Sequence, residues 1–237
     1  MLASGSAANG ATYLSGGLAP GSWAQVKGTL LSNVTRIWDA SDFVGLGAGL
    51  PVSLSGVQVL VNDLPAAVYY VDSGQVDFQA PNGVFGAVSV QVIRDGAASN
   101  PITAAAVKNA PGIFPNVING VNYPVAVFTD GVYVGNPAVS SAYRKAKPGD
   151  AMELYATLPA PKGIPGVTVT IGSITVAADF AGHTQYAGEF QINFTVPAQF
   201  ASLVAGNYPI TIAVNGVSSP STIDTPQPGP IVPPIQH

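Results

Sequence analysis

The sequence predicts an all-β protein made of two tandem domains that arose by internal duplication. Few residues are charged, 8% of 237, whereas 47% are hydrophobic and turn formers are frequent, with 27 Gly and 21 Pro. This composition favours short strands joined by turns over long helices. Apolar and polar residues alternate in several runs, among them VQVLV from Val57 and VTVTI from Val167, which is the period of a half-buried strand. The phrase QVDFQAP from Gln75 returns as QINFTVP from Gln191, which indicates a repeated unit.

The repeated blocks predict the strands of each half in order. The blocks that recur are PGSWAQVKGTL from Pro20 with PGDAMELYATL from Pro148, GVQV from Gly56 with GVTV from Gly166, QVDFQAP with QINFTVP, and VQVIRDG from Val90 with ITIAVNG from Ile210. The last block of each half ends in a dipeptide that accepts positive φ angles in a tight hairpin, Asp95-Gly96 or Asn215-Gly216. Because the blocks keep their order while the spacing between them varies, we expect a tandem duplication with insertions.

The block positions also predict the domain boundaries. The first domain is expected at residues 1–107, with a loop insertion at 32–55, and the second at residues 108–225. Loops that lengthen on a rigid β scaffold are common places for binding surfaces, so the insertion is a candidate site. Residues 226–237, PQPGPIVPPIQH, form a proline-rich tail that cannot join a central strand and should be extended or disordered.

Charge and cysteine content exclude several classes of function. The formal net charge is −4, and the basic cluster YRKAK at residues 143–147 is too small for a nucleic-acid footprint. The absence of cysteine excludes a disulfide framework and a thiolate site. No apolar run of about 18 residues is present, and the first 17 residues lack the regions of a signal peptide. We therefore expect no nucleic-acid partner, no membrane span and no cofactor, and an exported protein would be a mature or trimmed form.

A resemblance to a known family runs from about Asn9 to about Thr222. The motifs that carry the resemblance are APGIF at Ala110–Phe114, followed in order by AVFTDG, KPGDAMELYAT and GVTVTIG. This ordered set resembles an uncharacterised domain found at the C-terminal ends of many secreted acidobacterial proteins. The resemblance implies two Ig-like β-sandwich domains similar to the IPT/TIG type, an extracellular or bacterial cell-surface location, and no catalytic residues to carry over.

Candidates for catalysis are few. A Ser-His-acid arrangement would have to use His183, which we expect to be a solvated loop residue. Two carboxylate pairs could serve in glycoside hydrolysis, Asp39 with Asp42 and Asp150 with Glu153. Asp150 and Glu153 should diverge, because residues three apart in a strand face opposite sides. Asp39 and Asp42 supply too few oxygens for calcium, which takes about six to eight. We therefore predict no catalytic and no metal site.

Aromatic residues of the insertion are the better binding candidates. Trp38 and Phe43 lie beside Asp39 and Asp42, and exposed rings with polar neighbours suit stacking on sugar rings. These four residues are the predicted ligand-binding set. The alternative is that Trp38 folds back and closes the end of the sandwich, which is the more common fate of a lone loop tryptophan.

Four further aromatic residues are expected to be structural. Tyr69 and Tyr70 are adjacent in a strand, so one of them should face outward as a cross-strand packing partner. Phe78 and Phe194 occupy equivalent positions of the repeat and should lie in the two cores.

These observations predict a non-enzymatic extracellular protein with a structural or adhesive role. Its partners would be copies of itself or other cell-surface proteins, and segments 1–17 and 226–237 could add strands to a neighbour's sheet in a surface layer or filament. The alternative is a carbohydrate-binding module that holds a polysaccharide on the 32–55 insertion. A hydrolase using Asp39, Asp42 or His183 is a distant third.

Overall fold

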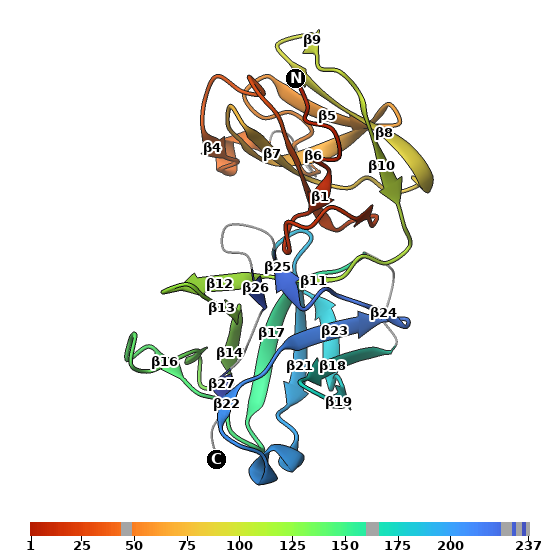
Figure 1. Ribbon diagram of the computed structural model, residues 1–237. Helices are drawn as coiled ribbons and strands as arrows, with labels where there is room; N and C mark the ends of the chain where they lie inside the picture. Colours follow the sequence, from red (N-terminus) through yellow and green to blue (C-terminus); the bar gives the residue numbers. More distant parts are fainter. Residues whose placement is uncertain (44–48, 160–165, 224–228, 231–233, 236–237) are drawn as a thin grey trace. The chain divides into compact units, whose positions relative to one another are not determined.

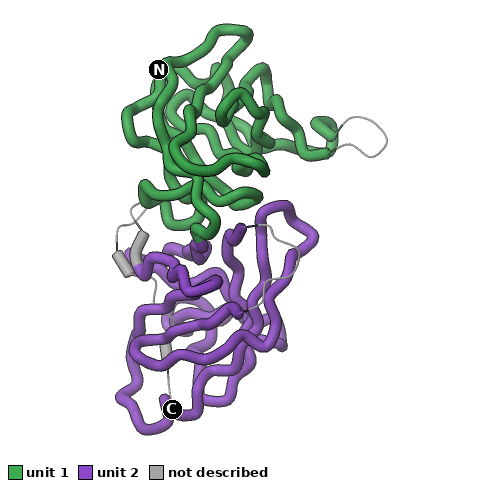
Figure 2. Tube along the Cα trace, turned by 90° about the vertical axis from the view of Figure 1, so that its right-hand side faces the viewer, with its two compact units in different colours: residues 1–110 green, residues 111–237 purple. Residues whose placement is uncertain are grey.

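A computed structural model of the chain divides into two compact units, Met1–Ala110 and Pro111–His237 (Figure 2). The structure describes residues 1–43, 49–159, 166–223, 229–230 and 234–235. They form β-strands and two short 3-10 helices, η1 (Ala40–Asp42) and η2 (Ala198–Ser202), so the all-β prediction is confirmed. The described residues contain no helix long and apolar enough to cross a membrane.

The first unit is a β-sandwich whose two layers share one long strand (Figure 1). Its strands are β1 (Ala8–Asn9), β2 (Gly17–Leu18), β3 (Trp23–Lys27), β4 (Arg36–Ile37), β5 (Val57–Val61), β6 (Leu64–Val71), β7 (Gln75–Gln79), β8 (Gly86–Arg94), β9 (Ala97–Ala98) and β10 (Ile102–Ala106). The order across the sheet is β1-β3-β7-β6-β5-β8-β10-β2, with β4 paired to β6 and β9 to β8. The first half of β6 pairs with β5 and the second half with β7, so β6 passes from one layer to the other.

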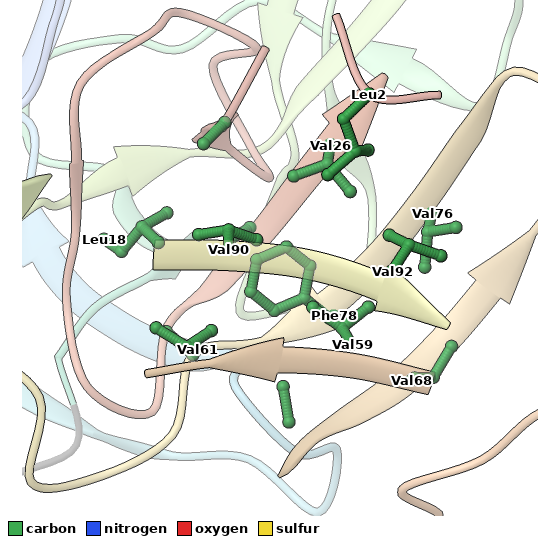
Figure 3. Packing of buried hydrophobic residues seen from close by; sticks show 14 of the residues in the cluster. Leu2, Leu18, Val26, Val59, Val61, Val68, Val76, Phe78, Val90 and Val92 are labelled. Carbon is green, nitrogen blue, oxygen red and sulfur yellow. The ribbon is translucent and has the colours of Figure 1, made fainter. Parts of the chain in front are cut away.

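The core of the first unit lies between these layers. Alternate residues of β5 and β8 are buried, and they meet buried residues of β3, β6 and β7. Figure 3 shows Phe78 among Val59, Val90 and Val92. Phe78 is fully buried, so its predicted core position is confirmed. Removing a side chain of this size from water contributes about 1.5–3 kcal/mol to folding.

The second unit repeats this arrangement with additional strands before it. Its strands are β11 (Gly112–Ile113), β12 (Pro115–Ile118), β13 (Val121–Pro124), β14 (Ala126–Phe128), β15 (Tyr133–Val134), β16 (Tyr143–Arg144), β17 (Ala151–Thr157), β18 (Val167–Ile171), β19 (Ile174–Ala177), β20 (Phe180–His183), β21 (Phe190–Thr195), β22 (Gly206–Asn207), β23 (Ile210–Val214), β24 (Val217–Ser218), β25 (Thr222–Ile223), β26 (Gly229–Pro230) and β27 (Pro234–Ile235). The larger sheet has the order β16-β15-β14-β17-β21-β20, and a second sheet has the order β19-β18-β23-β24. Phe194 is buried between them, as predicted.

Strand pairs built from the same sequence blocks have the same register in both units. The matching cross-strand partners are Ala24–Phe78 with Met152–Phe194, and Val59–Val92 with Val169–Ile212. Ser99 exchanges hydrogen bonds with the backbone of Val92, and Ser219 makes the same two bonds with Ile212. The origin of the units by duplication, with domains at 1–107 and 108–225, stays a prediction.

One strand differs between the units. The counterpart of β6 in the second unit is interrupted after Ala177 and forms two strands, β19 in one sheet and β20 in the other. Asp179, at the break, donates its backbone N–H to the carbonyl oxygen of Asn193 at 2.7 Å. The preceding residue, Ala178, donates its backbone N–H to the carbonyl oxygen of Val167 in the other sheet at 2.9 Å, so the chain passes from one sheet to the other here without a shared strand.

Both terminal segments pair with their own units. In segment 1–17, β1 pairs antiparallel with β3, and Leu2 is buried opposite Gly28. β2 begins at the end of this segment and pairs in parallel with β10. In the tail, 226–237, β26 pairs with β25 and β27 with β22, as two-residue edge strands in which proline is tolerated. β1 and β2 thus form the edges of the first unit's own sheet, and the described parts of the tail, which was expected to be extended or disordered, form two small two-stranded sheets.

Replacing Phe78 or Phe194 by Ala should lower the free energy of unfolding of its own unit by about 3–5 kcal/mol, because each substitution leaves a cavity at the same register position. Hydrogen exchange measured by mass spectrometry in urea would assign the loss to one unit. Phe85→Ala is the control, since Phe85 is 66% exposed and its loss should change stability by less than about 1 kcal/mol. Losses restricted to one of the two core variants would contradict the equivalence of the positions.

Candidate functional site

Four aromatic rings gather outside the core at the β3–β7–β6 layer of the first unit. Trp38 is the central ring, with its centroid 5.7 Å from Trp23, 5.1 Å from Tyr69 and 5.4 Å from Phe43. These three contacts are edge-to-face, with interplanar angles of 61°, 81° and 66°. Trp23 and Tyr69 also touch, with centroids 5.2 Å apart. Such pairs contribute about 0.5–1.5 kcal/mol each beyond the area that they bury.

Strand pairing brings Trp38 to this position. β4 pairs with the end of β6, and the backbone N–H of Trp38 then donates to the carbonyl oxygen of Tyr69 at 2.9 Å. A β-bulge between Val68 and Tyr70 makes Tyr69 an extra residue in β6. Tyr69 and Tyr70 are both half-buried. The expectation that one ring would face outward assumed unbroken alternation along the strand, which the bulge interrupts.

The turn formed by Asp39 and η1 holds Phe43 next to Trp38. Asp39 caps η1 by accepting the backbone N–H of Ser41 at 2.8 Å, and Asp42 accepts the backbone N–H of Asp39 at 2.8 Å. The guanidinium of Arg36 forms ion pairs with Asp42 and, at 3.2 Å, with Asp39. The hydrogen bonds from Ser41 lower the pKa of Asp39. The two carboxylates therefore fix the turn that leads to Phe43.

The structure thus brings together all four residues of the predicted ligand-binding set. Trp38 is half-buried and packs against the core of the first unit. Phe43 keeps 38% of its surface exposed. Residues 44–48 of the insertion lie outside the described residues. A ligand-binding role for Trp38, Phe43, Asp39 and Asp42 stays a prediction.

Sequence reasoning missed three members of this site. Trp23 alternates with the core residue Ala24, so its outward direction could have been read from the first repeated block. Arg36 is the cation nearest in sequence to the two acids of the insertion, which was a usable signal for their pairing. Tyr69 gave no such signal, because its position depends on the bulge and on a contact with a distant segment.

The other candidate residues do not form a catalytic arrangement. His183 lies at the end of β20 rather than in a loop, and its ring is 4.1 Å from that of Phe190. Asp150 is bound by Arg144 at 2.7 Å, and Glu153 lies apart from it on the outer face of β17. Among the residues that the structure describes, no group of three or more His, Asp or Glu side chains could hold a metal ion.

A largely buried carboxylate lies on the same layer as the aromatic cluster. Asp77 of β7 stands opposite Gln25 of β3 and accepts a hydrogen bond from Gln75 Nε2 at 2.7 Å. Burial raises the pKa of Asp77 to about 6, the charge of Asp72 raises it further, and the bond from Gln75 and the charge of Lys27 oppose the rise. This carboxyl therefore titrates well above the usual range of an aspartate.

Comparison with known families finds a match that lies within the first unit. The IPT/TIG domain model matches residues 42–106, from the last residue of η1 to the end of β10. A TIG/IPT Ig-like domain is therefore present there, which confirms this part of the resemblance seen in the sequence. A search of curated proteins finds no match.

Several solved structures are distantly similar to the whole chain. SGBP-B of the Bacteroides ovatus mixed-linkage glucan utilization locus, in complex with a mixed-linkage heptasaccharide, is 16% identical with a TM-score of 0.37, over 93% of this chain and 42% of that one. SGBP-B from a complex xyloglucan utilization locus in Bacteroides uniformis is 13% identical with a TM-score of 0.25, over 92% and 46%. Invasin, a bacterial integrin-binding protein, is 13% identical with a TM-score of 0.23, over 94% and 40%. The chain spans less than half the length of each of these proteins.

Replacing Asp77 by Asn should raise the free energy of unfolding at pH 7 by on the order of 1–2 kcal/mol. The pKa of Asp77 is about 6 in the folded state against an ordinary 3.8, so stability should fall in the native protein as pH rises from about 4 to about 6. The free energy of unfolding of Asp77→Asn should not show this decrease with pH. Asparagine fits the position, because the second unit has Asn193 at the matching place. Urea unfolding across this pH range is the measurement, with Asp63→Asn in an exposed turn as the control. Identical pH profiles for native protein and Asp77→Asn would refute the assignment.

Proposed function

We propose that the protein is a non-enzymatic structural or adhesive module of the bacterial cell surface or an extracellular polymer, built to bear tension along its chain. The observation that carries this proposal is the parallel pairing of β2, near the beginning of the first unit, with β10, its last strand. Its partners would be other surface proteins, copies of itself or a polysaccharide.

In the first unit, the N-terminal segment contacts the last strand and its flanking residues at two places. At one end, the backbone N–H of Leu2 donates to Asn100 Oδ1 at 2.8 Å, and Asn100 Nδ2 donates to the carbonyl oxygen of Leu2 at 3.0 Å. At the other end, Leu18 stands opposite Ala106, and Asn9 Nδ2 donates to the carbonyl oxygen of Ala110 at 2.9 Å. In Figure 1, residue 1 lies at one end of this unit and β10 leads out at the other.

This arrangement determines how a pulling force acts. Tension applied at residue 1 and at residue 110 would draw the two segments past each other, so their hydrogen bonds are loaded together rather than opened one after another. The side chains of Leu2 and Leu18 are buried, and the hydrogen bonds of Leu2 with Asn100 are partly buried, so separating the segments also exposes apolar surface. Unfolding under force is governed by the unfolding rate, which such simultaneous loading lowers.

The low charge of the chain fits a role in a crowded extracellular layer. Only 8% of residues are charged, so repulsion between neighbouring copies is weak. Self-assembly by strand addition would require β1 and β2, or the tail strands, to leave their own sheet edges and pair with another copy, which is domain exchange.

Asn100→Ala should lower the force at which the first unit unfolds, because it removes both bonds to Leu2. The measurement is single-molecule force spectroscopy on the full chain, pulled from its two ends. Gln79→Ala is the matched control, since it removes a side-chain hydrogen bond of 2.8 Å to Gly21 that lies outside the terminal segments. Each variant should lose about 1–2 kcal/mol at equilibrium, but only Asn100→Ala should unfold at clearly lower force. Equal unfolding forces in the two variants would overturn the proposal.

A second candidate function is carbohydrate binding by the insertion. The exposed ring of Phe43 beside Trp38, with carboxylates next to it, is the observation that favours it. Both tryptophans of the chain, Trp23 and Trp38, belong to this cluster, so the tryptophan fluorescence reports on the site directly.

Soluble neutral polysaccharides, hydroxyethylcellulose and galactomannan for example, should shift or quench this fluorescence in a saturable way if the insertion binds sugar. Phe43→Ala should weaken the effect about tenfold or more, as for a ring at the centre of a binding surface. Phe85→Ala, which removes an exposed ring elsewhere in the first unit, should leave it unchanged. An unaltered emission spectrum with every polymer would remove this candidate.

A further inference from the structure

A single row of side chains crosses the larger sheet of the second unit from edge to edge. Each member stands directly opposite the next in the neighbouring strand, from β16 through β15, β14, β17 and β21 to β20. The row consists of Tyr143, Tyr133, Val127, Glu153, Asn193 and Phe180. Directly opposed residues place their side chains on the same face of a sheet, so these six form one continuous surface.

This row faces away from the core. In β14 and β17 its members alternate with fully buried neighbours, as Glu153 does with Met152 and Leu154. The rings near the two ends are well exposed, with 48% of Tyr133 and 50% of Phe180 accessible. Tyr143 supports Tyr133, with ring centroids 6.1 Å apart.

A second row widens the surface next to the first. It consists of Tyr155, Gln191 and Gly182, which also stand opposite one another. The amide of Gln191 donates to Asn193 Oδ1 at 2.9 Å, which holds both amides in place on the face. A Cβ at Gly182 would lie only 2.6 Å from Cζ of Phe180, so glycine here lets the Phe180 ring lie down along β20.

The corresponding row of the first unit is less exposed. Gln25, Asp77 and Tyr70 hold the matching positions, and Gln25 is only 1% exposed. In the second unit, Glu153 at the position of Gln25 is partly exposed. The same scaffold therefore buries the middle position of this row in the first unit and leaves it partly exposed in the second.

We propose that this surface, the Tyr133–Phe180 face, binds an extended, uncharged polysaccharide. Exposed rings at both ends can stack on the apolar C–H faces of sugar rings, and the amides and carboxylate between them can bond to hydroxyl groups. Tyr133 and Phe180 lie four strand spacings apart, which is about 19 Å at roughly 4.8 Å per spacing. This length suits several consecutive sugar units.

Charge favours this ligand over a charged polymer. Of the nine residues in the two rows, one carries a formal charge, the carboxylate of Glu153. That single negative charge disfavours nucleic acids and anionic polysaccharides, which need basic contacts. Binding to the Tyr133–Phe180 face should therefore depend little on salt. The proposal rests on a different unit from the tension-bearing role and does not depend on it.

Affinity electrophoresis in native gels tests the proposal. The gels contain hydroxyethylcellulose, galactomannan, arabinoxylan or dextran, with polygalacturonate as the anionic comparison. At least one of the four neutral polymers should retard the native full chain, at low and at high salt. The Tyr133→Ala/Phe180→Ala variant should bind at least about tenfold more weakly. Phe85→Ala, which removes an exposed ring of the first unit outside the aromatic cluster, should be retarded like the native protein.

Three results would overturn the proposal. One is free migration of the native chain in all four neutral polymers. Another is unchanged retardation of the double variant. The third is a native oligomer, detected by light scattering, that the double variant converts to monomer without any polysaccharide binding, because the face would then be a protein interface. Circular dichroism checks the fold of the double variant. Asn193→Ala, which keeps both rings, gives a second measurement of the same face and should be retarded less than the native protein.

Discussion

The antiparallel register between β3 and β7, repeated between β17 and β21, is the constraint on which the rest of both units depends. It places Phe78 and Phe194 opposite small or apolar partners inside each sandwich. A slip of one residue would turn these rings outward and bring polar residues such as Asp77 and Asn193 into the cores. The outward-facing row that contains Asp77 in the first unit and Asn193 in the second is therefore a consequence of the pairing that builds the cores.

The sequence predicts the features that depend on local periodicity. Alternation alone identifies Phe78 and Phe194 as core residues, because period two is a property of the strand itself. The aromatic cluster depends instead on the pairing of β4 with β6, between segments more than 30 residues apart in the chain, and on a bulge at Tyr69. Neither leaves a pattern in a single sequence, so Trp38 and Phe43 could be named from their residue types, but Tyr69 could not be placed beside them.

The two units show how one scaffold supports different surfaces. At matching positions the first unit has Asp77 and Tyr70 where the second has Asn193 and Phe180. Ionising the largely desolvated Asp77 opposes folding, whereas an uncharged amide tolerates any pH. In the first unit Trp38 of the insertion packs on Trp23 and Tyr69 of this layer, whereas the larger sheet of the second unit has exposed rings at its sides.

The interruption between β19 and β20 has a consequence for cooperativity. In the first unit, β6 links both layers into one hydrogen-bonded network, so neither layer can open without disturbing the other. In the second unit two adjacent backbone N–H groups make this link, that of Ala178 to Val167 of the smaller sheet at 2.9 Å and that of Asp179 to Asn193 of the larger sheet at 2.7 Å. Opening one sheet would therefore pull on the hydrogen bonds of the other in both units, although the chain turns within two residues in the second and over a continuous strand in the first.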